Sequence, residues 1–420
     1  MSTAIAADRV HATRLYTLVG LTWLATRAIA VGAIVLLPRL LDDIDTYRTW
    51  LPALRAAAFP DADPKWQYPP GAGAVVLGPD LLPVDYAVAF VGLCLVFDLA
   101  IMAALITAHS RRAHPAAMGL WLWAAAGAAI GPIMVTRFDI VPAFFAVAAI
   151  LLVARPAWSG AAAAVGFLLK LWPALMILAL PRRRTRSGVI WFAVTTLVLL
   201  LVVTVTFDGA LSFLGNQRAR GLQVESTGSI PYWLFTLVGG RIASGMDYGS
   251  MQVQMAGAEA VGTIVTVIGL ALLALIAWWR LNGRLDGVSA GDVGVTLVLV
   301  MVASSRVYSP QFNVWLIAVA AAATINALSR MRTVAAILVG VAVLTQFVYP
   351  LFPTNFVDGE AWIVLIQAVR IAGLVGATVL AVRAIALAQR SAHRATADAA
   401  ATLSESTPPD IGTRTTTSAD

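Results

Sequence analysis

Long apolar runs alternate with short polar segments along nearly the whole chain. Most runs extend over about 17–25 residues, the length that an α-helix needs to cross a bilayer. The pattern therefore predicts an all-α polytopic membrane protein with about ten full spans. The first run lacks a small-residue cleavage site and is interpreted as a retained helix. The spans are expected near residues 15–38, 84–108, 116–135, 139–154, 188–207, 257–280, 290–305, 310–327, 333–349 and 361–385.

Residues 157–181 form an apolar segment that does not fit a single crossing, because basic residues flank both of its ends. Lys170 and Pro173 lie near its centre, and proline ends or kinks a helix. We predict a broken hairpin that enters the membrane and returns, since irregular backbone is tolerated where it lines a cavity. The alternative is one ordinary span. Counted as two short helices, the hairpin brings the total to about twelve.

Composition and charge agree with a membrane protein. Hydrophobic residues make up 60% of the chain, charged residues 12%, and the mean hydropathy is +0.82, which excludes an ordinary soluble domain. The net charge of +7 comes mainly from arginines in short connectors, so it reports membrane orientation and not nucleic-acid binding. The single cysteine, Cys94, lies in an apolar run and excludes a disulfide framework.

The distribution of basic residues predicts the orientation. With the amino terminus in the cytoplasm, every basic cluster falls on the cytoplasmic side. We expect a cytoplasmic amino terminus (1–14), a transmembrane domain (15–388) and a disordered cytoplasmic tail (389–420) in a multi-pass plasma-membrane protein. The outer face then receives two long external loops, 39–83 and 208–256, and with them most of the unusual polar chemistry.

The first external loop opens with an acidic cluster, Asp42, Asp43 and Asp45. All four histidines of the chain fall on the predicted cytoplasmic side, so a reaction on the outer face would need a carboxylate as its general base. These aspartates are the candidates nearest the membrane. A solvated or helix-capping acidic turn is the alternative.

Four cations lie at or near the predicted outer boundary: Arg137, Lys170, Arg220 and Arg306. A cation within the bilayer is costly, so it is usually paired or lines a polar cavity. Several that converge on one pocket would suit a lipid phosphate. Pairing with Asp139 is the alternative for Arg137, and snorkelling to headgroups is the alternative for the last two arginines. Arg27 and Asp98, at similar depths in the first two spans, are interpreted as an interhelical ion pair.

The second external loop carries Gln223 and Glu225 shortly before Trp233. Aromatic rings beside amide and carboxylate groups suit sugar binding, where rings stack on the C–H face and polar groups contact the hydroxyls. Interfacial anchoring of the aromatics is the alternative.

Five short motifs, taken together, resemble the glycosyltransferase 87 family over about residues 15–385. These motifs are Asp43-Ile44-Asp45-Thr46-Tyr47, Tyr68-Pro69-Pro70, Arg137-Phe138-Asp139, Lys170-Leu171-Trp172-Pro173 and Ser309-Pro310-Gln311-Phe312. The resemblance implies a GT-C-like bundle and a polyprenyl-phosphate-sugar-dependent transferase with its active site at the outer membrane surface. It also implies a catalytic aspartate in the first external loop, which the spacing to Tyr47 matches to Asp43 first and Asp45 second. A histidine that some members are thought to use has no counterpart here.

The function expected on these grounds is inverting transfer of a sugar to a cell-envelope glycan or glycolipid, with mannose first and arabinofuranose second. The domain 15–388 would be catalytic and is expected to need no cofactor. Asp43-Ile44-Asp45 formally matches an Asp-x-Asp metal motif, but a monophosphate leaving group that already faces several cations needs a metal less, so the interpretation without a metal is favoured and a metal stays the alternative. We expect Lys170, Arg137, Arg306 and Arg220 to bind the donor phosphate. We expect Tyr47, Tyr68, Asp139, Gln223, Glu225 and Gln311 to bind the sugar or the acceptor.

Two other classes stay open. A transporter or lipid-linked-sugar flippase also needs many spans, a broken helix and buried charges. No inverted repeat is visible between the two halves of the sequence, and the polar residues gather on one face, which favours the enzyme. An inactive homologue that serves as an assembly scaffold is the third class.

Overall fold

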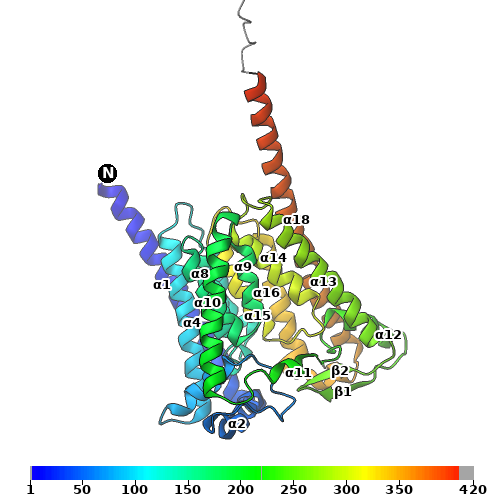
Figure 1. The fold of residues 1–420 in the computed structure, drawn as a ribbon. Coiled ribbons are helices and arrows are strands. Elements are labelled where there is room, and N and C mark those ends of the chain that lie inside the picture. The colour runs from blue at the N-terminus through cyan, green and yellow to red at the C-terminus, as the bar shows by residue number, and fades with distance from the viewer. Residues whose placement is uncertain (1, 219, 406–420) are drawn as a thin grey trace, which may run out of the picture.

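The computed structural model describes residues 2–218 and 220–405, with side chains at 10–37, 39–215 and 220–389. In this part of the chain six helices are long and apolar enough to cross a membrane, which confirms an all-α polytopic membrane protein (Figure 1). They are α1 (Ser2–Leu36), α4 (Tyr86–Ser110), α10 (Arg182–Thr206), α13 (Ala258–Leu281), α16 (Arg332–Gln346), which continues into η5 (Phe347–Leu351), and α18 (Ala361–Glu405).

Shorter apolar helices fill the interior between these long ones. Four expected spans, near residues 116–135, 139–154, 290–305 and 310–327, are helices of 12 to 14 residues, some with a short extension. At 1.5 Å per residue, each is about 20 Å long, against about 30 Å of hydrocarbon, so none of these helices is long enough by itself to cross a bilayer. These helices are α5 (Met118–Ile130), followed by α6 (Ile133–Thr136), α7 (Ile140–Leu151), α14 (Ala290–Ala303) and α15 (Phe312–Thr324).

The re-entrant hairpin consists of α8 (Pro156–Leu169), a break at Lys170, η3 (Trp172–Ala174) and α9 (Leu175–Ala179). Near its start, α8 packs so closely on α10 that a Cβ at Gly160 would clash with the carbonyl of Gly188. At its other end, the Leu168 carbonyl accepts a hydrogen bond from the Gly71 amide (2.9 Å). The chain then turns back to the start of α10, as expected for a hairpin that enters and returns.

Both loops expected on one face lie at the same end of the bundle, which we call the α2 end (Figure 1). The Phe59 amide donates to the Asp208 carbonyl (2.9 Å), and the Gln67 side chain donates to the Tyr248 carbonyl (3.0 Å), so the two loops contact each other. They contain short elements: η1 (Pro38–Leu41), α2 (Asp42–Arg55), α3 (Ala72–Leu77), η2 (Gly78–Leu81), α11 (Phe213–Arg218), η4 (Thr227–Ser229), α12 (Ile230–Thr236), and an antiparallel hairpin of β1 (Ser244–Asp247) and β2 (Ser250–Val253).

The start of α1 and the end of α18 project from the opposite end of the bundle (Figure 1). Helix α18, which follows the short α17 (Pro353–Val357), continues to Glu405, past the expected domain boundary at residue 388. The first part of the tail that we expected to be disordered, 389–405, is therefore helical. Residues 406–420 of that tail lie outside the described residues.

A buried ion pair connects α1 and α4, as expected from the sequence. Arg27 Nε lies 2.6 Å from Asp98 Oδ2, and both side chains are almost fully buried. Arg27 also donates to the Ala124 carbonyl of α5 (2.7 Å). The guanidinium therefore holds three helices together, and removal of either partner would leave an uncompensated charge in the core.

Candidate functional site

A cavity of about 940 Å³ lies at the α2 end, between α2, the α8–η3 break, α13 and the turn that joins α14 to α15. This volume is at the upper end of the range for small-molecule sites. One part of its wall is apolar and includes Leu171, Leu270 and Leu273. The charged residues that line it are Asp42, Asp43, Lys65, Arg137, Lys170, Arg220, Glu259 and Arg306.

Helix α2 presents one face to the cavity. Asp43, Tyr47 and Trp50 recur at helical spacing and line it. Asp45 follows Asp43 by two residues, about 200° around the helix, and its side chain is 62% exposed beside Arg48. The structure therefore brings Asp43 to the cavity and leaves Asp45 outside it.

Asp43 is held by a cation from a distant segment. Arg137, between α6 and α7, donates from Nε to Asp43 Oδ2 and from Nη1 to Gln311 Oε1, both at 2.6 Å. The pair is partly exposed to the cavity, at 29% for Asp43 and 20% for Arg137. Arg137 thus pairs with Asp43, and not with the neighbouring Asp139 that the sequence suggested as its partner. Gln311 orients the guanidinium.

Lys170 has its own carboxylate. Its Nζ lies 2.6 Å from Asp139 Oδ1, which also accepts a hydrogen bond from Trp315 Nε1 (2.9 Å). The ammonium lies between the rings of Tyr68, Phe138 and Trp315, 5.1–5.3 Å from their centroids. Cation–π contacts and one carboxylate therefore compensate this charge at the break of the hairpin. Asp139 is 2% exposed and is covered by Lys170, so it does not face the cavity.

Arg220 and Arg306 differ from these two cations, because no ion pair in the described part of the chain includes either one. Arg306 donates to Thr263 Oγ1 (2.6 Å) and to the Arg220 carbonyl (3.4 Å). Arg220 donates to Ser250 Oγ (3.4 Å), while its Nε lacks a partner among the described residues. Burial lowers the pKa of Arg220. Two guanidinium groups without carboxylates are suited to hold an anion.

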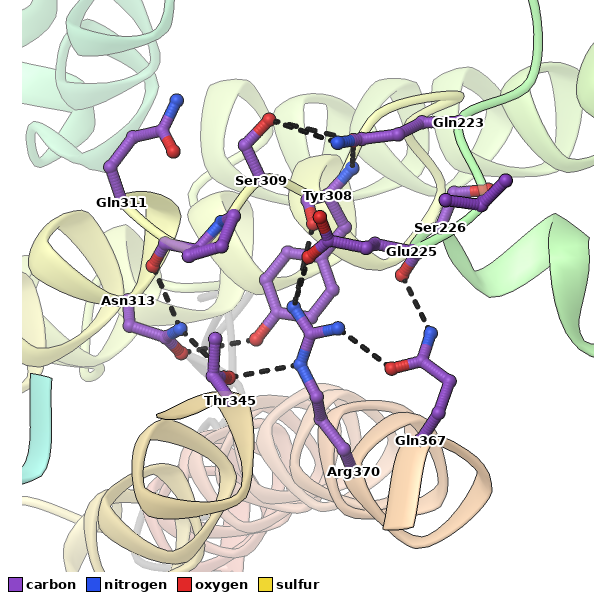
Figure 2. A network of polar contacts seen from close by, with 12 residues as sticks. Gln223, Glu225, Ser226, Tyr308, Ser309, Gln311, Asn313, Thr345, Gln367 and Arg370 are labelled. Carbon is purple, nitrogen blue, oxygen red and sulfur yellow. Dashed lines mark hydrogen bonds and ion pairs between the residues drawn. The ribbon is translucent and has the colours of Figure 1, made fainter. Parts of the chain in front are cut away.

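Gln223 and Glu225, expected at the sugar or the acceptor, lie behind the cavity wall. Gln223 is 3% exposed and accepts a hydrogen bond from the Tyr308 amide (2.9 Å). Glu225 faces Arg370 of α18, with 3.5 Å between the charged atoms (Figure 2). Burial raises the pKa of Glu225, and the Arg370 guanidinium partly offsets that rise. The structure does not bring these two side chains to the cavity.

Tyr47 and Tyr68 do line it, as part of an aromatic cluster with Trp50 and Phe138. Burial raises the pKa of Tyr68 to about 12, so its hydroxyl keeps its proton and can donate a hydrogen bond at neutral pH. The Tyr68–Gly71 segment packs very closely on the end of α8. A Cβ at Gly71 would lie 2.7 Å from the Leu168 carbonyl oxygen, so only glycine fits there.

Sequence reasoning missed an aromatic wall. Trp172 stacks on Trp315 at 5.1 Å between centroids, Phe312 stacks on Trp315 at 3.9 Å, and all three line the cavity. Two of these rings belong to motifs that the resemblance quoted, but no role followed from the motif alone. Within the described residues, no group of three or more His, Cys, Asp or Glu side chains could hold a metal ion.

The histidines whose side chains the structure describes do not line this site. His11, at the start of α1, and His109, at the end of α4, lie toward the end of the bundle opposite α2. His114 follows α4, and the side chain of His393 lies outside the described residues. None of the described histidines is among the residues that line the cavity.

Comparison with known proteins identifies the family. The family model for Glycosyltransferase family 87 matches residues 66–310, more than half of the chain. The match includes Tyr68, Arg137, Lys170 and Arg306, whereas Asp43 precedes it. No curated protein and no solved structure matches the chain. The chain belongs to glycosyltransferase family 87 and is a membrane glycosyltransferase.

Proposed function

We propose that this protein transfers a sugar from a polyprenyl-phosphate donor to a hydroxyl group of a cell-envelope glycan or glycolipid, with inversion at the anomeric carbon. The observation that carries the proposal is the composition of one cavity. It combines a carboxylate that is paired with an arginine, two guanidinium groups without carboxylate partners, and an apolar wall. A general base, a phosphate site and a site for a prenyl chain need these three elements.

Asp43 is the proposed general base. Its carboxylate accepts the proton of the acceptor hydroxyl, whose oxygen forms the new bond to the anomeric carbon. The bond from that carbon to the phosphate oxygen breaks, and its electron pair stays on the lipid phosphate. The hydrogen bond from Arg137 fixes one Asp43 oxygen (2.6 Å) and leaves the other free to face the acceptor.

Arg220 and Arg306 are the proposed ligands of the leaving phosphate. They form no ion pair with a described carboxylate, so their charge is available to stabilise the negative charge that develops as the bond breaks. Lys170 and Arg137 contribute at longer range, because Asp139 and Asp43 already compensate them. Tyr47, Tyr68 and the Trp172–Trp315 stack offer hydroxyls and ring faces to the sugar.

The apolar wall supports a lipid-linked donor. Leu273 lies about four turns into α13, so the cavity extends from the loops far along a long apolar helix. Leu171 and Leu270 on this wall are 40% and 60% exposed. A prenyl chain could lie against these side chains. Mannose is the first candidate for the sugar and arabinofuranose the second, both from the family resemblance.

The orientation is also part of the proposal. Arginines gather in the connectors at the end opposite α2, and positive residues favour the cytoplasm. The α2 end and its cavity then face the extracytoplasmic side of the plasma membrane, and both termini are cytoplasmic. Donor, acceptor and membrane lipids are the partners this implies.

A transfer assay tests the proposed function. Membranes that contain the protein are incubated with polyprenyl-phosphate-mannose or polyprenyl-phosphate-arabinofuranose and with candidate acceptors, and the anomeric configuration of the product is determined by NMR. We expect transfer from one of these donors, with inversion. Failure to transfer from any lipid-linked sugar, together with measurable flux of such a lipid across proteoliposomes, would favour a flippase instead.

A further inference from the structure

The turn between α14 and α15, residues 304–311, carries two groups that matter for the proposed site. Arg306 lies in this turn, and Gln311, which orients Arg137, ends it. The turn is not helical, so its backbone groups need partners from elsewhere in the fold. Their positions therefore depend on what packs behind the turn, on the side away from the cavity.

The loop at residues 222–226 supplies one set of partners. The backbone amide of Gln223 donates to the Arg306 carbonyl, and the backbone amide of Tyr308 donates to the side-chain oxygen Oε1 of Gln223, each at 2.9 Å. The Gln223 side chain also reaches Ser309 Oγ at 3.4 Å. These contacts fix the backbone on both sides of Val307.

Arg370, fully buried on α18, supplies the second set (Figure 2). Its Nη2 donates to the Tyr308 carbonyl (3.4 Å), and its guanidinium lies 4.1 Å from the centroid of the Tyr308 ring. Its Nε donates to Thr345 Oγ1 (2.9 Å) and its Nη1 to Gln367 Oε1 (2.7 Å). One side chain thus joins the turn to α16 and α18.

Glu225 is the carboxylate in this network. Its Oε2 lies 3.5 Å from Arg370 Nη2, and its backbone carbonyl accepts a hydrogen bond from Gln367 Nε2 (3.0 Å). Neither Glu225 nor Arg370 lines the cavity. A buried ion pair is weak evidence for stability, because an apolar pair of similar volume often stabilises a fold as well. Its better-attested use is to specify one arrangement of the segments that it joins.

We propose that the buried Glu225–Arg370 pair positions the 304–311 turn, and through it Arg306 and the Gln311–Arg137 contact, for binding of the donor phosphate. Both are positioning residues, because they act through the turn and touch no reacting group. The part that concerns phosphate rests on the proposed function, whereas the ordering of the turn does not.

The test compares Glu225→Gln and Arg370→Lys with the wild type in detergent. Glu225→Gln keeps the shape and removes the charge. Arg370→Lys keeps the charge but loses the planar fork that reaches Thr345 and Tyr308 together. Asp98→Asn is the matched control, since it also removes one carboxylate from a buried ion pair with arginine, but from the pair that joins α1 to α4.

Two readouts are measured on each protein: amide hydrogen exchange in residues 304–311, and the dissociation constant for polyprenyl phosphate without a sugar. In Glu225→Gln and in Arg370→Lys we expect exchange in the turn to accelerate and the affinity to fall about 10–100-fold. We expect neither change in Asp98→Asn.

The outcomes separate the two ideas. Unchanged exchange in the turn of both site variants would overturn the positioning role, whatever the ligand. Faster exchange with unchanged affinity would overturn the link to phosphate. Wild-type protein that binds no polyprenyl phosphate would instead count against the proposed function, and the exchange data would still decide whether the pair orders the turn.

Discussion

Two pairs among the five cations that line the cavity differ in one respect, which is whether a carboxylate forms an ion pair with them. Arg137 and Lys170 each lie 2.6 Å from an aspartate, whereas Arg220 and Arg306 form no ion pair within the described residues. The paired cations add little net charge and fix the geometry of Asp43 and of the hairpin break. The unpaired cations keep their guanidinium groups free of any ion pair with a described carboxylate. This difference separates residues that organise the site from residues available for an anionic ligand.

The largest expected effect is at Asp43, the carboxylate that pairs with Arg137. Asp43→Asn should lower kcat by about 10²–10⁴-fold, because the variant cannot accept the proton of the acceptor hydroxyl. Its affinity for polyprenyl phosphate should change much less. Asp45→Asn is the matched control, since Asp45 lies on the opposite face of α2. Equal activity of both variants in the transfer assay would remove Asp43 as the base.

Lys170→Met should destabilise the fold by about 3–5 kcal/mol, because it leaves the buried Asp139 without its cation. Addition of Asp139→Asn should recover part of this loss, since the uncompensated charge then disappears. Denaturant unfolding of the purified proteins measures both steps. If Lys170→Met alone is as stable as the wild type, the Lys170–Asp139 pair does not organise the hairpin break.

For the unpaired cations, we expect Arg306→Gln to raise the dissociation constant for polyprenyl phosphate about tenfold. A hydrogen bond to a charged group contributes about 1.5–3 kcal/mol, and about 1.4 kcal/mol corresponds to a factor of ten. Stability should stay near that of the wild type, because no carboxylate loses its partner. Arg48→Gln is the control, since Arg48 pairs with Asp45 and Asp85 outside the cavity. A larger loss of affinity in Arg48→Gln than in Arg306→Gln would contradict the assignment of the unpaired cations to the phosphate.

The smallest expected effect is the response to salt. Arg220 and Arg306 are partly exposed, so ionic strength screens their attraction for an anion. The wild-type dissociation constant for polyprenyl phosphate should rise a few-fold between about 0.05 and 0.5 M salt. The rise should be smaller in the Arg220→Gln/Arg306→Gln variant. Binding to the wild type that does not respond to salt would argue against an electrostatic phosphate site.

The sequence predicted the fold class and the long helices well, because twenty or more apolar residues leave few alternatives. It also predicted the break at Lys170, since a lysine and a proline inside an apolar run are difficult to place in a straight span. It did not distinguish full spans from the short interior helices α7, α14 and α15. A fully buried helix is apolar on all sides, and so is one that faces lipid.

The site was less predictable, because its contacts join distant segments. Arg137 and Asp43 are 94 residues apart, and a nearer carboxylate, Asp139, made the local pair look reasonable. The helical period of α2 separates Asp43 from Asp45, but the sequence did not show that this loop segment is a helix. The polar loop composition suggested sugar contacts for Gln223 and Glu225, and only the fold shows that both point behind the cavity wall.

The structure of the Asp43→Asn variant with a bound polyprenyl-phosphate sugar tests the central claim most directly. We expect the phosphate oxygens within about 2.7–3.1 Å of the guanidinium groups of Arg220 and Arg306, the prenyl chain along α13, and the anomeric carbon facing residue 43. A donor bound with its phosphate outside this cavity, or held only by the paired cations Arg137 and Lys170, would contradict the account.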